Sequence, residues 1–410
     1  MLDYNSTLII GGGIAGHHAA KSLRKEGFEG NITLVEGEAE VPYDRPPLSK
    51  EYLSGAQEEK DFTLFSKEEY TELSVNLLSG VKAKKIHAEE CKVETDDGRF
   101  FPYSNLILAT GSSLRKLSVD GDHLDGIHYL KSLSDARKLK NSLTKIKRIA
   151  IIGAGFIGLE VAAVCREKGI EVSVIEMGDL PMSHLFGKEA GQYFYDIHDR
   201  KDVTFLTNDS VSHFEGERKV EKIRTKKGKV VPCDAVVIGI GVMPNTSITH
   251  PDLQVNKGYI TDEYGRTTLP HVYAAGDCAE WTYQNKSIVV AHWDHAMNQG
   301  KSIAKNIVHN HSEPYRAVPF FWSNQYDQQF QFVGLPLQDA TIVFRGSPED
   351  GEFSCFYADN NQVIHGALMV NQPKNVIPAR KFIQKQQAMD LQQISDPTIL
   401  LKKVQPLQKI

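Results

Sequence analysis

The sequence lacks the cysteine patterns that mark dithiol and zinc chemistry. Its 410 residues include five widely spaced cysteines: Cys91, Cys165, Cys233, Cys278 and Cys355. No C-x-x-C pair and no zinc-ligand spacing occurs among them, so we predict neither a redox disulfide nor a zinc site. We expect most of these thiols to be buried in a protein of a reducing compartment.

Long apolar runs and an excess of basic charge are also missing. No apolar stretch approaches the ~20 residues that cross a bilayer. A net charge of -5 argues against partners such as nucleic acid or an anionic membrane. The opening segment has no basic region followed by an apolar core, so it does not resemble a secretory signal. We therefore expect a soluble, cytoplasmic protein with two or three domains.

The sequence does contain a nucleotide-binding turn close to its start. An apolar run that predicts a buried strand precedes G-G-G-I-A-G at 11–16, and a helical segment follows. In such a turn Gly11 permits the tight bend, Gly13 lets the backbone approach a pyrophosphate, and Gly16 lets the helix lie against the strand. The next apolar run ends in Glu36, whose carboxylate can accept hydrogen bonds from a ribose.

The same pattern occurs a second time. The sequence G-A-G-F-I-G at 153–158 again follows an apolar run and precedes a helical segment, and the next apolar run ends in Glu176. The alternative is that both are tight turns that bind no nucleotide. That alternative does not explain why each turn lies between a strand and a helix and is followed by an acid at the end of the next strand. Because a carboxylate accepts from a 2′-hydroxyl and repels a 2′-phosphate, Glu176 favours NADH, while Arg166 and Lys168 nearby would soften that preference.

A later strand suggests how the chain is organised into domains. Residues 271–275 repeat the pattern of a strand followed by glycine, and Gly276 and Asp277 come directly after them. An acid at the carboxyl end of a parallel strand lies where ligands bind, although Asp277 could equally cap a helix. The first sheet needs this strand, so we predict an FAD-binding domain formed by 1–115 and 243–318, an NAD-binding domain at 116–242 and a C-terminal α+β domain at 319–410.

Two dinucleotide sites in one chain predict a flavin and a nicotinamide. The cofactors carry the hydride transfer, and the protein positions them. FAD suits the first site, because a permanently held cofactor is gripped by several segments of the chain. Residues 47–50, Asp277 and Trp322 are candidates for those further contacts.

Over nearly its whole length the sequence resembles the FAD-dependent NAD(P)H ferredoxin reductases of bacterial oxygenase systems. This family includes putidaredoxin reductase, rubredoxin reductase and the reductase components of aromatic-ring dioxygenases. The motifs that carry the resemblance are at 11–16, 45–50 (R-P-P-L-S-K), 108–111, 152–160, 239–241, 275–277 and 321–323 (F-W-S). The resemblance implies an α/β fold with two Rossmann-like domains, of the glutathione-reductase-like two-domain type, plus a C-terminal α+β domain.

Taken with the motifs, the resemblance implies the residues of both cofactor sites. The expected FAD contacts are Gly11, Gly13, Ile14, Ala15, Gly16, Glu36, Arg45, Lys50, Val81, Ala109, Thr110, Gly111, Lys131, Gly276, Asp277, Trp293 and Trp322. The expected NAD contacts are Gly153, Gly155, Phe156, Ile157, Gly158, Glu160, Glu176 and Gly241.

The resemblance also implies catalytic roles for Lys50, Glu160 and Trp322. It places Lys50 near the reactive N5 edge of the flavin, Glu160 as the acid that pairs with this lysine, and Trp322 close to the isoalloxazine. A lysine there can stabilise negative charge that develops on the flavin, and the carboxylate can modulate that effect. The alternative for Glu160 is a solvated acid on a helix.

No metal is expected. The group formed by His292, Asp294 and His295 is better explained as the polar start of a helix beside a flavin than as a set of metal ligands.

The leading functional prediction is NADH-dependent reduction of FAD, followed by single-electron transfer to a small ferredoxin or rubredoxin of an oxygenase system. The basic segment from Lys374 to Lys385 is a candidate docking surface, and a solvated helix face is the alternative. One other possibility is an NADH oxidase or a reductase of quinones or monodehydroascorbate. Another is a redox-sensing flavoprotein resembling apoptosis-inducing factor.

Overall fold

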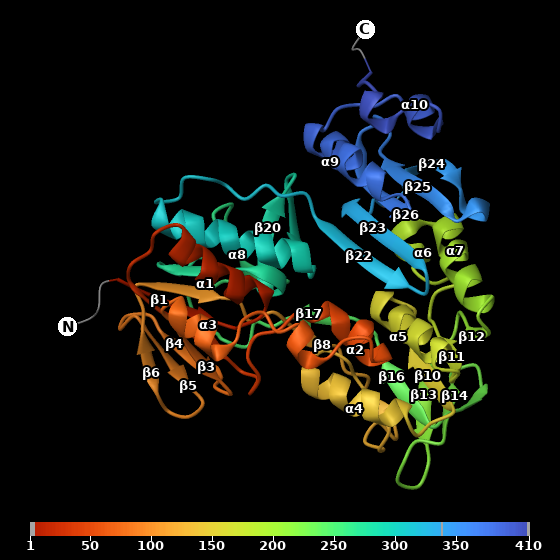
Figure 1. Ribbon diagram of the computed structural model, residues 1–410, viewed down its shortest axis with the longest axis horizontal. Coiled ribbons are helices and arrows are strands. Elements are labelled where there is room, and N and C mark those ends of the chain that lie inside the picture. Colours follow the sequence, from red (N-terminus) through yellow and green to blue (C-terminus); the bar gives the residue numbers. More distant parts are fainter. Residues whose placement is uncertain (1–4, 338, 408–410) are drawn as a thin grey trace. The chain divides into compact units, whose positions relative to one another are not determined.

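The computed structural model describes residues 5–337 and 339–407 of the chain. These residues fold into two compact units, each assembled from three separate segments (Figure 1). Of the described residues, unit 1 contains 5–44, 59–113 and 242–319, and unit 2 contains 45–58, 114–241 and those from 320 onward. Strand β8 (Ser112–Leu114) spans the boundary after Ser113, and strand β17 (Val242–Pro244) begins at the boundary after Gly241. The chain also crosses from one unit to the other after Asp44, Glu58 and Pro319. The predicted boundaries of three domains stay a prediction.

A five-stranded parallel sheet forms the centre of unit 1, in the order β19-β7-β1-β2-β3. Its strands are β1 (Ser6–Ile10), β2 (Asn31–Glu36), β3 (Val75–Ser79), β7 (Asn105–Leu108) and β19 (Val272–Ala274). β1 is buried along its whole length, as the apolar run predicts for a strand covered on both faces. The late strand β19 pairs with β7, so the chain returns to its first sheet.

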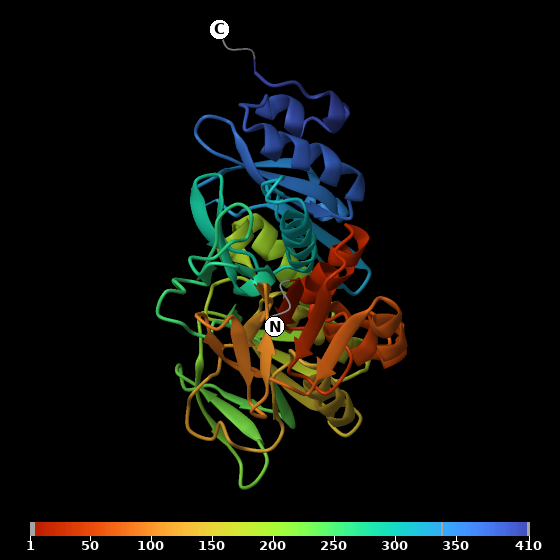
Figure 2. The ribbon, with the colours of Figure 1, turned by 90° about the vertical axis from the view of Figure 1, so that its left-hand side faces the viewer.

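Helices α1 (Ile14–Lys25) and α8 (Trp293–Val308) pack side by side in unit 1 (Figure 2). The remaining helices of this unit are η2 (Glu59–Asp61), α3 (Lys67–Glu72) and η3 (Gly276–Cys278). One small antiparallel sheet contains β4 (Ala83–His87), β5 (Lys92–Thr95) and β6 (Phe100–Pro102). Another small sheet contains β18 (Tyr259–Ile260), β20 (Ala279–Tyr283) and β21 (Lys286–Val289).

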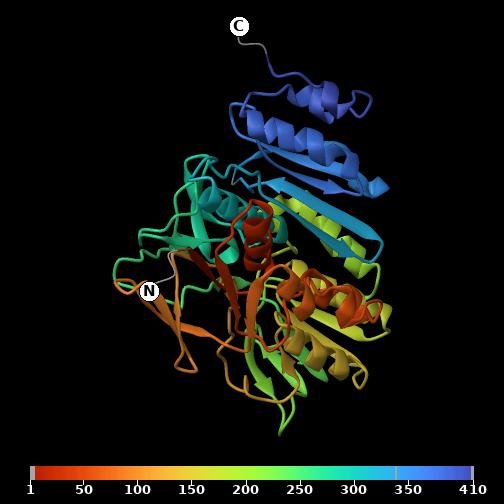
Figure 3. The ribbon, with the colours of Figure 1, turned by 60° about the vertical axis from the view of Figure 1, so that its left-hand side comes forward.

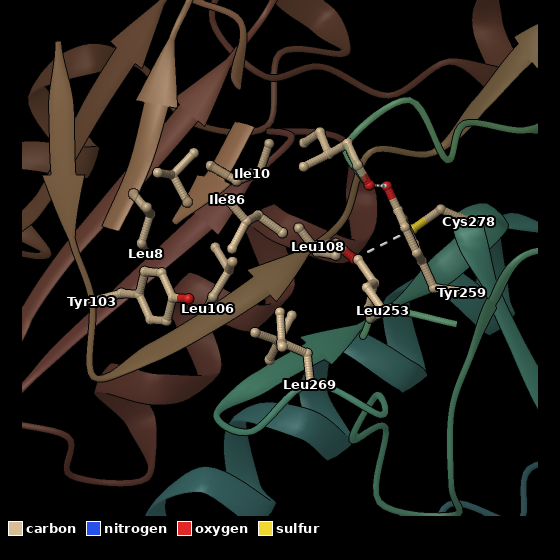
Figure 4. Close-up of a cluster of buried hydrophobic side chains, with 14 of the residues drawn as sticks. Leu8, Ile10, Ile86, Tyr103, Leu106, Leu108, Leu253, Tyr259, Leu269 and Cys278 are labelled. Atoms are coloured by element: carbon tan, nitrogen blue, oxygen red, sulfur yellow. Dashed lines mark hydrogen bonds between the residues drawn. The ribbon is translucent and has the colours of Figure 1, made fainter. Parts of the chain in front are cut away.

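A hydrophobic core joins the parallel sheet of unit 1 to its smaller parts (Figure 4). Leu8 and Leu106 of the sheet are packed with Ile86 of the small sheet and with Tyr259. The Cys278 thiol lies in this core and donates a hydrogen bond to the carbonyl of Leu108 at 3.3 Å. Burial raises the pKa of this thiol, so it is a structural group.

Unit 2 contains a second five-stranded parallel sheet, in the order β12-β11-β10-β16-β9. Its strands are β9 (Ile127–His128), β10 (Arg148–Ile152), β11 (Glu171–Ile175), β12 (Val203–Leu206) and β16 (Ala235–Ile238). Around it are η1 (Pro46–Ser49), α2 (Glu51–Ser54), α4 (Leu133–Leu143), α5 (Phe156–Glu167), α6 (Ser183–Phe186) and α7 (Lys188–Asp199). A small antiparallel sheet adds β13 (Val211–Glu215), β14 (Lys222–Thr225) and β15 (Val230–Pro232).

The C-terminal part of unit 2 is a five-stranded antiparallel sheet in the order β22-β23-β26-β25-β24. Its strands are β22 (Phe320–Gln325), β23 (Gln328–Gly334), β24 (Thr341–Ser347), β25 (Glu352–Ala358) and β26 (Ile364–Val370). Helix α9 (Val376–Lys385) packs on β23 and β26 (Figure 3). The other helices here are η4 (Pro348–Asp350), η5 (Pro373–Asn375), α10 (Leu391–Ser395) and η6 (Leu401–Lys403).

The predicted fold class is confirmed, with two Rossmann-type parallel sheets and a C-terminal antiparallel α+β part. Within the described residues, no helix is both long and apolar enough to cross a membrane.

Candidate functional sites

The first glycine turn connects β1 to α1 and has a shape that only glycine permits. Gly11 has a φ of +105°, and a Cβ there would lie 2.1 Å from the carbonyl oxygen of Ala109. A Cβ on Gly16 would lie 1.9 Å from the carbonyl oxygen of Gly11. A Cβ on Gly13, in contrast, would meet nothing within 4 Å, so open space borders the start of α1. These are the tight contacts and the open approach that a pyrophosphate cradle requires.

The start of α1 is suited to an anion. Helices α3 and α4 begin with capping boxes, in which serine side chains bond the first backbone N–H groups. Helix α1 begins after Gly13 with no side-chain cap and no acidic residue in its first turn. Its first N–H groups and the positive end of its dipole are therefore available to a phosphate. The predicted contacts Ile14 and Ala15 lie in this first turn.

Glu36 is held beside the first cradle by the backbone. Its Oε2 accepts a hydrogen bond from the Gly12 N–H at 2.6 Å, and its Oε1 accepts one from the Glu38 N–H at 2.8 Å. The carboxylate thus has a fixed position next to the glycine turn, where it can also accept from a ribose hydroxyl. These residues fit a dinucleotide at this site.

The second glycine turn, between β10 and α5 in unit 2, repeats the first. A Cβ on Gly158 would lie 2.2 Å from the carbonyl oxygen of Gly153, whereas a Cβ on Gly155 would meet nothing within 4 Å. Helix α5 also begins without a side-chain cap or an acidic residue in its first turn. Glu176 accepts from the N–H groups of Ala154 and Gly178, each at 2.7 Å. Both cradles therefore present the same anion site and the same anchored carboxylate.

Not every side chain predicted at the second cradle points towards a ligand. The Phe156 ring packs in an aromatic cluster, 5.9 Å from Phe186 and 4.8 Å from Phe321 between ring centroids. A contact between Phe156 and a nucleotide would therefore come from its backbone. Ile157 is 44% exposed, and Gly241 adopts a φ of +94° at the end of its segment.

Glu160 and Lys50 form a buried ion pair in unit 2. Lys50 Nζ lies 3.2 Å from Glu160 Oε1, and the two side chains are 11% and 3% exposed. Ser49 Oγ donates to Glu160 Oε2 at 2.5 Å, and Ser323 Oγ donates to Oε1 at 2.6 Å. These donors offset part of the cost of burying a carboxylate. The alternative interpretation of Glu160 as a solvated helix acid is wrong, because its side chain is buried.

Three further predicted residues lie in unit 2. The Arg45 guanidinium donates to the carbonyl oxygen of Lys131 at 2.8 Å, so these two predicted flavin contacts are neighbours. Trp322 lies on β22, and its ring stacks against Phe320 with centroids 6.2 Å apart. Sequence reasoning did not assign Ser49 and Ser323 to the site, although both lie in the motifs that carry the resemblance.

Unit 1 holds the other predicted flavin residues. Ser112 Oγ donates to Asp277 Oδ2 at 2.7 Å, and the Trp293 indole N–H donates to Asp44 Oδ1 at 2.7 Å. Burial raises the pKa of the Asp44 carboxyl, against the effect of this hydrogen bond. Sequence reasoning missed Asp44, which lies directly before the R-P-P-L-S-K motif and carries no spacing signal of its own.

The remaining predicted positions of unit 1 lie around the first cradle. The Gly276 N–H donates to the Gln299 side chain at 2.7 Å, and Val81 donates its N–H to the carbonyl of Glu36 at 3.0 Å. The segment from Ala109 to Gly111 follows β7 directly. The predicted flavin residues therefore divide between the units, and each group is clustered within its own unit.

His292, Asp294 and His295 do not form a metal site in the structure. In the described part of the chain, no group of three or more His, Cys, Asp or Glu side chains could hold a metal ion. Burial lowers the pKa of His292 to about 4 and that of His295 to about 3, so both imidazoles are neutral. His295 Nδ1 lies 3.1 Å from the Tyr315 hydroxyl, which marks it as a core histidine.

Comparisons with known proteins match nearly the whole chain. A family model described as pyridine nucleotide-disulphide oxidoreductase matches residues 5–300, and a model described as reductase C-terminal matches residues 320–405. The chain is 37% identical to rhodocoxin reductase of Rhodococcus erythropolis over 97% of this chain and 93% of that protein. It is 34% identical to the ferredoxin–NAD(+) reductase component of the p-cumate 2,3-dioxygenase system of Pseudomonas putida, over 98% of each.

Solved structures of two reductases are also similar to this chain over nearly its whole length. The reductase in the crystal structure of the covalent putidaredoxin reductase–putidaredoxin complex is similar with a TM-score of 0.93, at 30% identity and 97% coverage of both chains. A ferredoxin reductase of Rhodopseudomonas palustris is similar with a TM-score of 0.93, at 32% identity, covering 97% of this chain and 99% of that chain.

Proposed function

The chain belongs to the pyridine nucleotide-disulphide oxidoreductase family, and from that premise we propose that it takes hydride from NADH and passes electrons singly to a small ferredoxin or rubredoxin, as the reductase component of an oxygenase system. The observation that carries this proposal is the repeated cradle, one in each unit, with its anchored Glu36 or Glu176. When bound, FAD would accept the hydride and release its two electrons one at a time.

The two cradles have separate tasks in this proposal. In unit 1 the start of α1 binds the pyrophosphate of FAD, and Glu36 accepts from its ribose. In unit 2 the start of α5 binds the pyrophosphate of NADH. Glu176 keeps both oxygens on backbone N–H groups and so presents a negative charge that disfavours a 2′-phosphate.

The state of the cysteines is consistent with a proposed electron path that uses no pair of thiols. All five cysteines are unpaired, and Cys165, Cys233, Cys278 and Cys355 are buried. Burial raises the pKa of Cys165 and of Cys233 to about 12, so neither is a thiolate at neutral pH. In the proposed reaction the electrons therefore pass to the acceptor without a protein disulfide.

Lys50 and Glu160 supply the electrostatic control in the proposed reaction. The resemblance assigns Lys50 to the edge of the flavin where negative charge develops, and a fixed ammonium stabilises such charge. The buried Glu160 carboxylate holds the ammonium in place at 3.2 Å and limits its effect. The roles of Arg45, Lys131 and Trp322 stay predictions of the same kind.

The partner surface in this proposal is α9 with Lys374 of η5. Lys374, Lys381 and Lys385 are exposed there, and Ile377 is 67% exposed between them. Arg380 is half-buried, with its guanidinium 5.3 Å from the Phe320 ring centroid. An apolar residue surrounded by lysines fits an acidic protein that buries a small contact area. The relatives named above include a reductase crystallised with its putidaredoxin partner.

Anaerobic stopped-flow spectroscopy tests the proposed function. NADH should bleach the absorbance of the bound flavin rapidly, and an oxidised iron–sulfur protein should restore it rapidly. Restoration by oxygen or a quinone, but not by ferredoxins or rubredoxins, would favour the oxidase or small-acceptor alternative. A bleached spectrum that persists with every acceptor would favour the redox sensor.

A further inference from the structure

A chain of hydrogen bonds leads from Glu160 to the turn between β22 and β23. Ser323 Oγ, which donates to Glu160, lies 3.2 Å from the Gln325 side-chain nitrogen and accepts its N–H. Gln325 Oε1 lies 3.0 Å from His198 Nε2, and His198 Nδ1 lies 3.0 Å from the Tyr326 hydroxyl. Ser323, Gln325 and His198 are all buried, and all of these residues belong to unit 2.

The hydrogen-bonding capacity of each group decides which partner donates in every hydrogen bond of this series. An ionised Glu160 can only accept, so Ser323 must donate to it and accept from the Gln325 amide. The oxygen of that amide can only accept, so His198 must carry its proton on Nε2. His198 Nδ1 then accepts from the Tyr326 hydroxyl. Burial lowers the pKa of His198 to about 4, which agrees with a neutral imidazole.

The turn that supplies Tyr326 has an unusual backbone. Tyr326 has a φ of +55°, a left-handed conformation that bulky residues rarely adopt. Its ring lies 5.0 Å from the His198 ring between centroids, and its hydroxyl bonds that imidazole. Contacts with His198 thus hold a conformation that a tyrosine otherwise avoids, and such conformations persist where surrounding structure fixes them.

We propose that His198 and Gln325 are positioning residues, which act through Ser323 to hold the Glu160 carboxylate in the orientation that pairs it with Lys50. This inference rests on the proposed function, in which the Lys50–Glu160 pair controls the cofactor. This series of hydrogen bonds orients the Glu160 carboxylate and does not conduct protons, because the Gln325 amide donates hydrogen bonds without releasing its protons. Neutral donors also stabilise the carboxylate without competing with the charge of Lys50.

The charged groups near the chain lie at its two ends. Lys50 contacts Glu160 at the inner end, while Ser49 and Ser323 supply uncharged donors there. At the outer end Lys201 lies over the Tyr326 ring at 5.6 Å, and Arg166 and Glu167 act on the same tyrosine.

The first test uses nitrogen-15 NMR of the full-length protein with labelled histidine. We expect His198 to be neutral, with its proton on Nε2, from neutral pH down to about pH 5. A protonated imidazole at neutral pH, or a proton on Nδ1, would overturn the inference. This measurement does not depend on an electron acceptor, so it separates failure of the inference from failure of the proposed function.

The second test compares Ser323→Ala, Gln325→Leu and His198→Phe with wild type. The readout is the pH dependence of the single-turnover rate at which NADH bleaches the flavin. Loss of a hydrogen bond leaves the Glu160 carboxylate and its ion pair with Lys50 less firmly positioned, so the pH profile should differ from that of wild type. At neutral pH the rate should drop about three- to tenfold, the effect of one hydrogen bond. Ser323→Thr, which keeps the hydroxyl, should restore the wild-type profile.

Tyr193→Phe is the matched control. Tyr193 also lies on α7 and donates to the side chain of Gln328 on β23 at 2.7 Å, but this bond does not lead to Glu160. Its pH profile should match wild type. Adding Gln325→Leu to Glu160→Gln should change nothing further, because the acceptor at the end of the chain is gone. Identical profiles for wild type and the three chain variants, or full additivity with Glu160→Gln, would overturn the proposal.

Discussion

Glu160 and Lys50 meet as a buried ion pair at 3.2 Å, although one lies on a helix of the second Rossmann-type sheet and the other follows a proline-rich loop. Because both side chains are almost fully buried, removal of one charge leaves the other without compensation. Glu160→Gln should therefore lower the free energy of unfolding by about 3 kcal/mol in urea denaturation at neutral pH.

Glu90→Gln is the control for this prediction. Glu90 pairs with Lys92 on the surface, where it is 60% exposed. Its replacement should change the free energy of unfolding by less than about 1 kcal/mol. Equal effects of the two substitutions would contradict the assignment of Lys50–Glu160 as a buried pair. The double variant Lys50→Met/Glu160→Gln should recover part of the lost stability.

Buried neutral histidines should make the protein sensitive to acid. Burial lowers the pKa of His17 to about 3, of His198 to about 4 and of His295 to about 3. The unfolded chain binds protons on these groups below about pH 6.5 while the native state does not, so stability is complete above that pH and falls below it. Each of these histidines should lower the free energy of unfolding by about 2 kcal/mol at pH 5 relative to pH 7. Denaturation of His295→Asn should show a smaller loss over this interval, and an unchanged slope would contradict the prediction.

The two kinds of glycine in the second cradle should behave differently when replaced. Gly155→Ala adds a methyl group to open space, so the protein should fold normally while NADH binding weakens at least about tenfold, or ~1.4 kcal/mol. Gly158→Ala places a Cβ 2.2 Å from the Gly153 carbonyl oxygen and should lower the melting temperature. Calorimetric titration with NADH and thermal denaturation distinguish the two. A destabilised Gly155→Ala protein would show that this space is filled by the protein itself.

Glu176 should set the choice between NADH and NADPH. Glu176→Gln removes the negative charge but keeps an acceptor oxygen, so kcat/KM for NADPH should rise about tenfold while that for NADH changes little. Glu171→Gln, at the exposed start of the same strand β11, is the control and should leave both values unchanged. If the ratio of the two cofactors does not move, the assignment of Glu176 to the ribose is wrong.

Local patterns in the sequence predicted the sheets and the cradles. The apolar run of β1 and the close contact of Gly16 with Gly11 are local features of the chain, and the structure has both. The constraint on Gly11 also comes from the distant carbonyl of Ala109. The predicted relation to ferredoxin reductases of oxygenase systems is also confirmed, by full-length similarity. The hydrogen bonds that Trp293 donates to Asp44 and Ser323 donates to Glu160 join residues far apart in sequence, so no spacing rule could reveal them.

Side-chain direction was the other feature beyond the reach of the sequence. A glycine fingerprint does not show that the Phe156 ring turns into an aromatic cluster, because that direction depends on Phe186 and Phe321 from other segments. Likewise, the sequence does not show that the basic residues between Lys374 and Lys385 differ in exposure: Arg380 lies over Phe320, while Lys381 is exposed. Tertiary packing decides which members of a charged run are available to a partner.

Charge reversal on α9 tests the docking surface. The residues to reverse are the exposed lysines, because Arg380 is packed against Phe320. Lys381→Glu/Lys385→Glu should slow reduction of an acidic ferredoxin about tenfold at low salt, and the difference should shrink as added salt screens the charges. Lys226→Glu/Lys227→Glu, on the exposed turn between β14 and β15, carries the same change in charge and should have a smaller effect. Bleaching of the flavin by NADH should be unchanged in both, because neither pair lies in a cradle. Equal slowing by the two double variants would mean that net charge, and not α9, guides the partner.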